Sequence, residues 1–199
     1  MTREAVAALR SGLPVVLPTD TVYGLCASPY SSAPCGRLYR LKGRAAVQPT
    51  ALVAADLDAL LECVPELRGR AAVIARALLP GPYTLVLPNP GRRFPWLNGA
   101  DPEAIGVRVP ELPEVSRAVV AALGAVAATS ANLAGGPDPR TLGDVPQEIL
   151  EGVGAAVDGG ELPGTPSTVL DFTGPEPRVV REGAAAAAGA LSRVRAALA

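Results

Sequence analysis

The stretch IGVRVPELPEVSRAVVAALGAVAATSAN, residues 105–132, indicates the fold class. We expect IGVRVP (105–110) to form a strand and ELPEVSRAVVAALG (111–124) a helix, because apolar residues recur there at the matching periods. AVAATSAN (125–132) is expected to be a buried strand that runs into a loop. An alternation of strands and helices is typical of α/β proteins, so we predict an α/β fold with a largely buried, twisted sheet.

The same alternation extends in both directions along the chain. Helices are expected over 2–11, 31–42, 56–63, 68–79, 144–151 and, as an alanine-rich C-terminal segment, 184–199. Further strands are expected over 14–18, 50–54, 83–88, 155–158, 167–172 and 178–181. TDTVYG (19–24) is expected to be a loop that leads toward the helix at 31–42, with no strand between them. Residues 89–103 form a long polar Pro/Gly-rich segment, which is typical of functional or mobile loops.

Length and composition limit the classes of function. A chain of 199 residues with 49% hydrophobic and 19% charged residues is expected to be one soluble domain, residues 1–199. Its net charge of -1 argues against a general nucleic-acid binder. The absence of histidine excludes catalysis by Ser–His–Asp or Cys–His and zinc bound by histidine.

Cysteine usage and apolar runs indicate the compartment. Cys26, Cys35 and Cys63 are an odd number without a C-x-x-C pair, which favours reduced thiols in a cytoplasmic protein. The N-terminus lacks the pattern of a signal peptide. We also expect no association with a membrane, since no apolar run is long enough to cross one.

Lys42 is the only lysine among the 18 Lys and Arg residues. It lies in a basic cluster with Arg37, Arg40 and Arg44 at the end of the predicted helix 31–42. A solvated helix face is the usual explanation of such a cluster, and chance explains one lysine. The alternative is an anion site, because lysine is a compact point charge whereas arginine is a planar fork.

Hydroxyl groups lie at one end or the other of several predicted strands. ATSAN (128–132), GTPSTVLDF (164–172) and PTDTVYG (18–24) each place Ser or Thr at a strand end, where an ordinary turn or a ligand site would explain them. Arg108 lies in the apolar run VRVP, so it points outward at an edge or inward toward a partner. A substrate carboxylate would match its fork. Neither a Walker A motif nor G-x-G-x-x-G is present.

Taken in order, these segments resemble a known family. LPTDTVYGL, LKGR, PGPYTLVLP, VRVP, TSAN, DGG, STVLDF and VVREG together resemble the YrdC-like threonylcarbamoyl-AMP synthases over about residues 13–183. The resemblance implies a twisted, mixed β-sheet flanked by helices, with a concave basic cleft. It implies synthesis of L-threonylcarbamoyladenylate from L-threonine, bicarbonate or CO2, and ATP, with release of pyrophosphate. Mg2+ is expected to accompany ATP, and no protein ligand for the ion is predicted.

The resemblance also assigns residues. The family's K-x-R and S-x-N motifs fall on Lys42, Arg44, Ser130 and Asn132. Lys42 and Arg44 are the implied catalytic residues, with Lys42 reaching the phosphates or the carbamate. The implied ATP contacts are Arg44, Gln48, Ser130, Asn132, Asp138 and Arg181, and the implied threonine contacts are Thr21, Arg108, Ala128 and Ser167.

The sequence departs from the family pattern at several of these places. Val53 stands at a common histidine position, Gln48 replaces a common Asn, Ala104 a common Thr, and Glu182 the Pro of RPG. These changes leave open a related amino acid as substrate or a reduced activity. Longer relatives carry a second C-terminal domain, and this chain is expected to be the single-domain form.

Two other functions remain as alternatives. One is a non-catalytic RNA-binding module that uses the same cleft, with Tyr23, Tyr30, Phe94 and Trp96 as candidates for stacking on bases. The other is a carbamoyl-adenylate enzyme that acts on a different acceptor. In the synthase hypothesis, the product is used to modify an adenosine in tRNA, so tRNA or tRNA-modifying proteins are expected partners.

Overall fold

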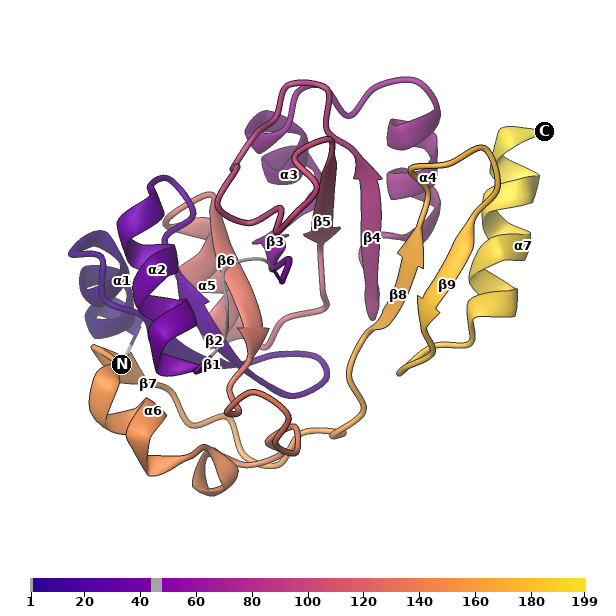
Figure 1. Cartoon of the computed structure of the whole chain (residues 1–199). Coiled ribbons are helices and arrows are strands. Elements are labelled where there is room, and N and C mark those ends of the chain that lie inside the picture. Colours follow the sequence, from indigo (N-terminus) through magenta and orange to yellow (C-terminus); the bar gives the residue numbers. More distant parts are fainter. Residues whose placement is uncertain (1, 44–47) are drawn as a thin grey trace.

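The computed structural model describes residues 2–43 and 48–199 (Figure 1). The helices and strands in chain order are α1 (Thr2–Arg10), β1 (Val15–Pro18), β2 (Tyr23–Ala27), α2 (Ser32–Leu41), β3 (Ala51–Ala54), α3 (Leu57–Cys63), α4 (Arg70–Leu78), β4 (Tyr83–Pro88), β5 (Ala104–Arg108), α5 (Glu114–Ala121), β6 (Ala125–Ser130), the 3-10 turn η1 (Leu142–Asp144), α6 (Gln147–Gly152), β7 (Ala155–Ala156), β8 (Thr168–Asp171), β9 (Arg178–Arg181) and α7 (Ala187–Leu198).

Over the described ranges, nine strands form one mixed sheet in the order β7-β1-β2-β6-β3-β5-β4-β8-β9. The pairs β1/β7, β3/β5 and β4/β8 are parallel, and the other neighbours are antiparallel. Helices flank the sheet, as Figure 1 shows. The predicted α/β class with a mixed, helix-flanked sheet is therefore confirmed.

The half of the sheet that contains β1, β2 and β6 is covered on both faces. Alternate residues of a strand point to opposite faces, and in β2 Leu25 enters one hydrophobic core whereas Cys26 enters a second. The second core is closed by α1 and α5, which contribute Leu9 and Val119. The apolar positions of this half are thus packed on both faces of the sheet, whereas the end of β6, with Thr129 and Ser130, is polar and lines a cavity.

The other half of the sheet, made of β5, β4 and β8, is covered on only one of its faces. Leu85 of β4 and Val107 of β5 point into the first core. The second core, which α1 and α5 close, contains no described residue of β4, β5 or β8. The alternate side chains of these strands, such as Thr84 and Val86, instead line a cavity. The sheet thus provides the floor of an open site.

The predicted segments agree with the structure except at β2. Residues 23–27 were expected to belong to a loop and the approach to a helix, but they pair with β1 and β6. All five residues of YGLCA are buried, so this strand lacks the polar alternation that identifies a half-exposed strand. Residues 89–103 contain no helix or strand, as expected of a loop.

Candidate active site

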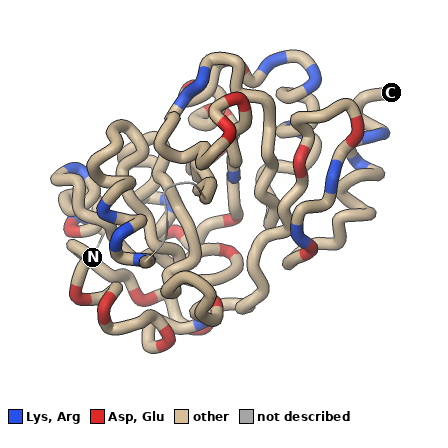
Figure 2. Tube along the Cα trace, in the orientation of Figure 1, with Lys and Arg blue, Asp and Glu red and all other residues tan. Residues whose placement is uncertain are grey.

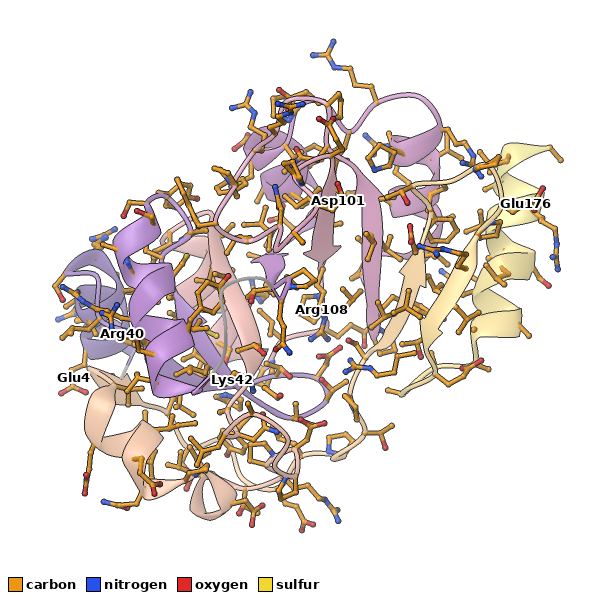
Figure 3. All side chains as sticks on the ribbon, viewed as in Figure 1. Glu4, Arg40, Lys42, Asp101, Arg108 and Glu176 are labelled. Atoms are coloured by element: carbon orange, nitrogen blue, oxygen red, sulfur yellow. The ribbon has the colours of Figure 1, made fainter. Side chains whose placement is uncertain are left out.

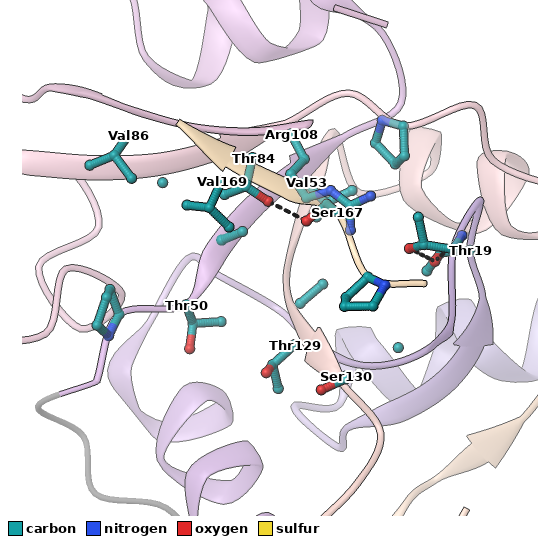
Figure 4. Close-up of a pocket in the computed structure, with 18 of the residues that line it drawn as sticks. Thr19, Thr50, Val53, Thr84, Val86, Arg108, Thr129, Ser130, Ser167 and Val169 are labelled. Atoms are coloured by element: carbon teal, nitrogen blue, oxygen red, sulfur yellow. Dashed lines mark hydrogen bonds between the residues drawn. The ribbon is translucent and has the colours of Figure 1, made fainter. Parts of the chain in front are cut away.

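A cavity of about 450 Å³ occupies the open half of the sheet (Figure 4). Its floor includes Val53 of β3, Gly106 of β5, Val86 of β4 and Val169 of β8, which are small or apolar. Its rim is formed by the end of β6, by loops that carry hydroxyl and carboxylate groups, and by the arginines of β5 and β9. An apolar floor with a few convergent polar groups is typical of a small-molecule site.

The lone lysine lies beside the end of β6. Helix α2 ends at Leu41, Lys42 caps it, and Gly43 takes the positive φ of 62° that reverses the chain. The Lys42 ammonium donates to the carbonyl oxygens of Ser130 (2.8 Å) and Asn132 (3.0 Å) and to the Asn132 side-chain oxygen. The side chains of these three residues are therefore brought together.

This arrangement explains why the position requires lysine. Lys42 is 5% exposed, and an ammonium can aim its three donors at closely spaced oxygens, which a planar guanidinium cannot do. The Ser130 hydroxyl also donates to the Asn132 side-chain oxygen at 2.7 Å. Lys42 thus fixes the turn that presents Ser130 to the cavity, where Figure 4 shows its side chain. Arg44 lies outside the described residues.

Arg108 points inward and is paired within the protein. Its Nη2 lies 2.8 Å from Asp20 Oδ1, and the two side chains are only 12% and 9% exposed. Burial lowers the pKa of Arg108, the Asp20 carboxylate opposes that shift, and nearby Arg181 adds to it. Among the described residues, neither Arg108 Nε nor Asp20 Oδ2 has a hydrogen-bond partner, although both are buried.

Ser167 links two walls of the cavity. Its hydroxyl lies 2.8 Å from the Thr84 hydroxyl (Figure 4). Arg181 Nη2 donates to the Ser167 carbonyl oxygen at 2.8 Å. Arg178, on the same strand as Arg181, pairs with Asp171. These contacts hold the Arg181 guanidinium of β9 over the start of β8.

Most of the residues assigned from the sequence meet in this cavity. Its lining includes Thr21, Arg108, Ala128, Ser130, Asp138, Ser167 and Arg181. Lys42 and Asn132 are bonded directly to Ser130, and Gln48 is exposed beside Pro49, which lines the cavity. The described lining contains three arginines and three aspartates. Figure 2 shows that positions of both signs are spread along the whole trace. The basic character of the cleft stays a prediction.

Comparison with known proteins gives the family. The family model described as telomere recombination, for Sua5, YciO and YrdC proteins, matches residues 7–183. The chain belongs to the Sua5/YciO/YrdC family. The threonylcarbamoyl-AMP synthase of Stenotrophomonas maltophilia is 36% identical over 161 residues, which cover 78% of this chain and 84% of that protein. The threonylcarbamoyl-AMP synthase of Pyrococcus abyssi is 32% identical over 182 residues, or 91% of this chain and 53% of that protein.

Solved structures of family members have the same fold. Sua5 of P. abyssi, crystallised in complex with L-threonine, has a TM-score of 0.83 and 32% identity, over 92% of this chain and 54% of that one. E. coli YciO has a TM-score of 0.81 and 28% identity, over 93% and 90%. The chain thus spans about half the length of the P. abyssi relative and nearly all of YciO.

Some polar residues of this family member's cavity were not assigned from the sequence. Asp20 was noted within PTDTVYG, but nothing local connects it to Arg108, which is 88 residues away. Thr84, Thr50 and Asn98 line the cavity, whereas Asp20 is connected to it through Arg108. Thr84 sits in an ordinary apolar strand pattern, and Thr50 and Asn98 carry no motif, so only the folded chain identifies them.

The aromatic residues considered for base stacking lie elsewhere. Tyr23 is buried, and its hydroxyl donates to Gly160 O at 2.8 Å. Tyr30, Phe94 and Trp96 line a separate depression, where the Tyr30 and Phe94 rings are 6.1 Å apart. None of the four lines the main cavity. The idea that these rings stack RNA bases in the same cleft is therefore wrong.

The remaining predictions concern thiols and membranes. Cys26, Cys35 and Cys63 are all free, as expected. Burial raises the pKa of the Cys26 and Cys35 thiols to about 12, which suits structural rather than reactive cysteines. None of the helices in the described ranges is long and apolar enough to cross a membrane.

Proposed function

We propose that this chain synthesises L-threonylcarbamoyladenylate from L-threonine, bicarbonate or CO2, and ATP, and releases pyrophosphate. The relatives that match most of its length are named threonylcarbamoyl-AMP synthases. The enzyme would thus be a nucleotidyltransferase whose product supplies the threonylcarbamoyl group for an adenosine in tRNA. Its macromolecular partners would be tRNA or the proteins that transfer this group.

One observation carries the proposal. A single cavity is lined both by the residues assigned to threonine, such as Arg108 and Ser167, and by those assigned to ATP, such as Ser130 and Arg181. Arg181 donates directly to Ser167, so the two groups of residues are in contact. Two substrates held side by side in this way gain the large advantage of proximity and orientation.

The Arg108–Asp20 pair suits an amino acid. The buried Arg108 Nε is an unused donor for a carboxylate, and the buried Asp20 Oδ2 is an unused acceptor for an amine. Unpaired buried polar atoms cost free energy, and a bound zwitterion would satisfy both. The P. abyssi relative was crystallised with L-threonine, which supports threonine as the amino acid.

The chemistry requires alignment more than proton transfer by side chains. The threonine amine attacks CO2, forms a C–N bond and loses a proton, which gives a carbamate. A carbamate oxygen then attacks the α-phosphorus in line, and the bond to pyrophosphate breaks. Donors such as Arg181 and the Ser130 hydroxyl would stabilise charge on the phosphoryl oxygens. Lys42 would act by holding the Ser130–Asn132 turn against the nucleotide.

Mg2+ would accompany ATP. The described part of the chain has no group of three or more His, Cys, Asp or Glu side chains that could hold a metal. We therefore propose that phosphate oxygens and water supply most of its ligands, as is usual for Mg2+. The ion would neutralise charge on the phosphates.

The direct test is an assay of the purified protein with ATP, Mg2+, labelled bicarbonate and a panel of amino acids. We expect a labelled adenylate with threonine alone, together with one pyrophosphate per product. Incorporation with another amino acid would instead indicate a different specificity, at a cavity that has Val53 and Ala104 in its lining. Failure to form any adenylate from folded, ATP-binding protein would overturn the proposal, and salt-dependent RNA affinity would then favour a binding module.

A further inference from the structure

Two buried polar atoms at one corner of the cavity have no partner in the described parts of the chain. They are the Thr50 hydroxyl oxygen and the Asn98 side-chain oxygen. Both residues line the cavity, and they are 3% and 4% exposed. We call this place the Thr50–Asn98 corner. Buried oxygens without partners are costly, so their persistence beside a cavity points to a ligand that satisfies them.

The fold fixes both groups. The Thr50 backbone N–H donates to Leu97 O at 2.8 Å, which joins the start of β3 to the loop 89–103. Asn98 Nδ2 donates to Arg93 O at 3.0 Å. Since that partner is an acceptor, the amide nitrogen must face it, and the amide oxygen is turned away as a fixed acceptor.

The corner lies away from the amino-acid end of the cavity. Val53 of β3 is paired with Arg108 of β5, so Thr50 lies three residues, or about 10 Å, before the level of Arg108. Figure 4 places Thr50 apart from Arg108 and Ser167. Asp101, at the opposite end of β5 from Arg108, belongs to the same side of the cavity (Figure 3).

The chemistry of the corner disfavours a phosphate. The Asn98 oxygen is an acceptor and Asp101 is an anion. Of the three arginines in the lining, Arg108 and Arg181 lie level with each other at the other end of the sheet, and Arg178 is paired with Asp171. Pro49, Val86 and Ala104 add apolar wall surface. Such a site fits a flat, uncharged ring that carries one hydrogen-bond donor and one acceptor at its edge.

We propose that the Thr50–Asn98 corner binds the base of the nucleotide and is selective for a 6-aminopurine. The Asn98 oxygen accepts a hydrogen bond from the exocyclic amine, and the Thr50 hydroxyl donates to the adjacent ring nitrogen. This inference rests on the proposed function, because it takes ATP as the nucleotide in this cavity. To that function it adds the two residues that determine which base is bound.

The two residues differ in what they discriminate. A 6-oxopurine presents an oxygen where adenine presents an amine, and that oxygen would face the fixed acceptor of Asn98. The Thr50 hydroxyl can rotate to donate or accept, so it adds affinity for either base. Asn98 therefore determines the preference for adenine over a 6-oxopurine, whereas Thr50 contributes to the affinity for either base.

The test compares ATP with inosine triphosphate, in which the 6-amino group is replaced by an oxygen. Dissociation constants of both would be measured by calorimetry for the wild type, Thr50→Val, Thr50→Ser and Asn98→Leu. We expect the wild type to prefer ATP by about tenfold or more. Thr50→Val should weaken both nucleotides by about tenfold, whereas Thr50→Ser, which keeps the hydroxyl, should change them by less than about threefold. Asn98→Leu should bring the ratio close to one.

Equal affinity of the wild type for the two nucleotides would overturn the inference, and so would unchanged binding by Thr50→Val. Neither result depends on whether Asn98→Leu folds. The reaction itself is assayed separately with the wild type. Adenylate formation without base selectivity would overturn only this inference, whereas selectivity without adenylate formation would overturn only the proposed reaction.

Discussion

Replacing Asp20 by Asn tests how much the buried ion pair between Asp20 and Arg108 contributes to the stability of the fold. The substitution keeps the size of the side chain and an oxygen that can accept the hydrogen bond from the Thr21 hydroxyl. It removes the negative charge that lies 2.8 Å from Arg108 Nη2. Two unit charges about 4 Å apart interact by about 4 kcal/mol at an effective dielectric constant of 20. Removing one partner of a buried ion pair lowers the free energy of unfolding by about 3–5 kcal/mol. We expect the free energy of unfolding of Asp20→Asn to fall by about 3 kcal/mol.

The assay is urea unfolding at pH 7, supported by thermal melting. For a chain of this size, a loss of about 3 kcal/mol should lower Tm by roughly 6–12 °C. Arg108→Met and the double variant complete a cycle, in which the double variant should lose less than the sum of the single losses by about 2 kcal/mol or more. Strictly additive losses, or a loss below about 1 kcal/mol for Asp20→Asn, would refute the reasoning.

Three further predictions follow from individual side chains. Lys42→Met should slow adenylate formation by about 100-fold, and Lys42→Arg should not restore it because a planar fork cannot replace the ammonium; steady-state kinetics with folded variants would measure this. A thiol reagent at pH 8 should leave Cys26 and Cys35 unmodified until the protein unfolds, since their pKa of about 12 leaves about one thiolate in ten thousand. Asp144 accepts hydrogen bonds from the backbone and side chain of Thr141, which lower its pKa below the ordinary 3.8. Its contribution to stability is present above about pH 4 and lost as pH falls through the lowered pKa, so Asp144→Asn should flatten the acid side of the stability profile.

Local patterns were sufficient for most of the fold and insufficient at β2. The strands that follow an apolar-polar alternation or a clear apolar run, such as β4 and β6, were found where expected. β2 is buried on both faces between β1 and β6, and it contains Gly24, so neither alternation nor β-propensity marks it. Its pairing with β6 joins residues about a hundred positions apart.

The candidate site shows the same limit in its polar contacts. Motif order was enough to predict that Arg108, Ser130 and Ser167 share a site, and the cavity brings them together. The direction in which Arg108 points could not be predicted, since it depends on Asp20, 88 residues distant. Thr50 lines the cavity at the place where the loop 89–103 returns to the start of β3 and Leu97 accepts its N–H, a contact that local sequence does not show.

Lys42 illustrates how a correct motif can leave the role of a residue open. The lone lysine was expected to reach the phosphates or the carbamate, a role that stays a prediction. In the folded chain its ammonium is bonded to oxygens of Ser130 and Asn132. These contacts join residues 88 and 90 positions apart, so local sequence could not predict them.

The central claim is that one cavity holds the amino acid and the nucleotide in contact. A crystal structure of the protein with threonine and a non-hydrolysable ATP analogue tests it most directly. We predict the threonine carboxylate at Arg108 and the α-phosphorus about 5 Å from the threonine nitrogen, which leaves room for one CO2 between atoms that react from about 3–3.5 Å. Threonine bound away from Arg108, or a nucleotide bound outside the cavity, would contradict the account.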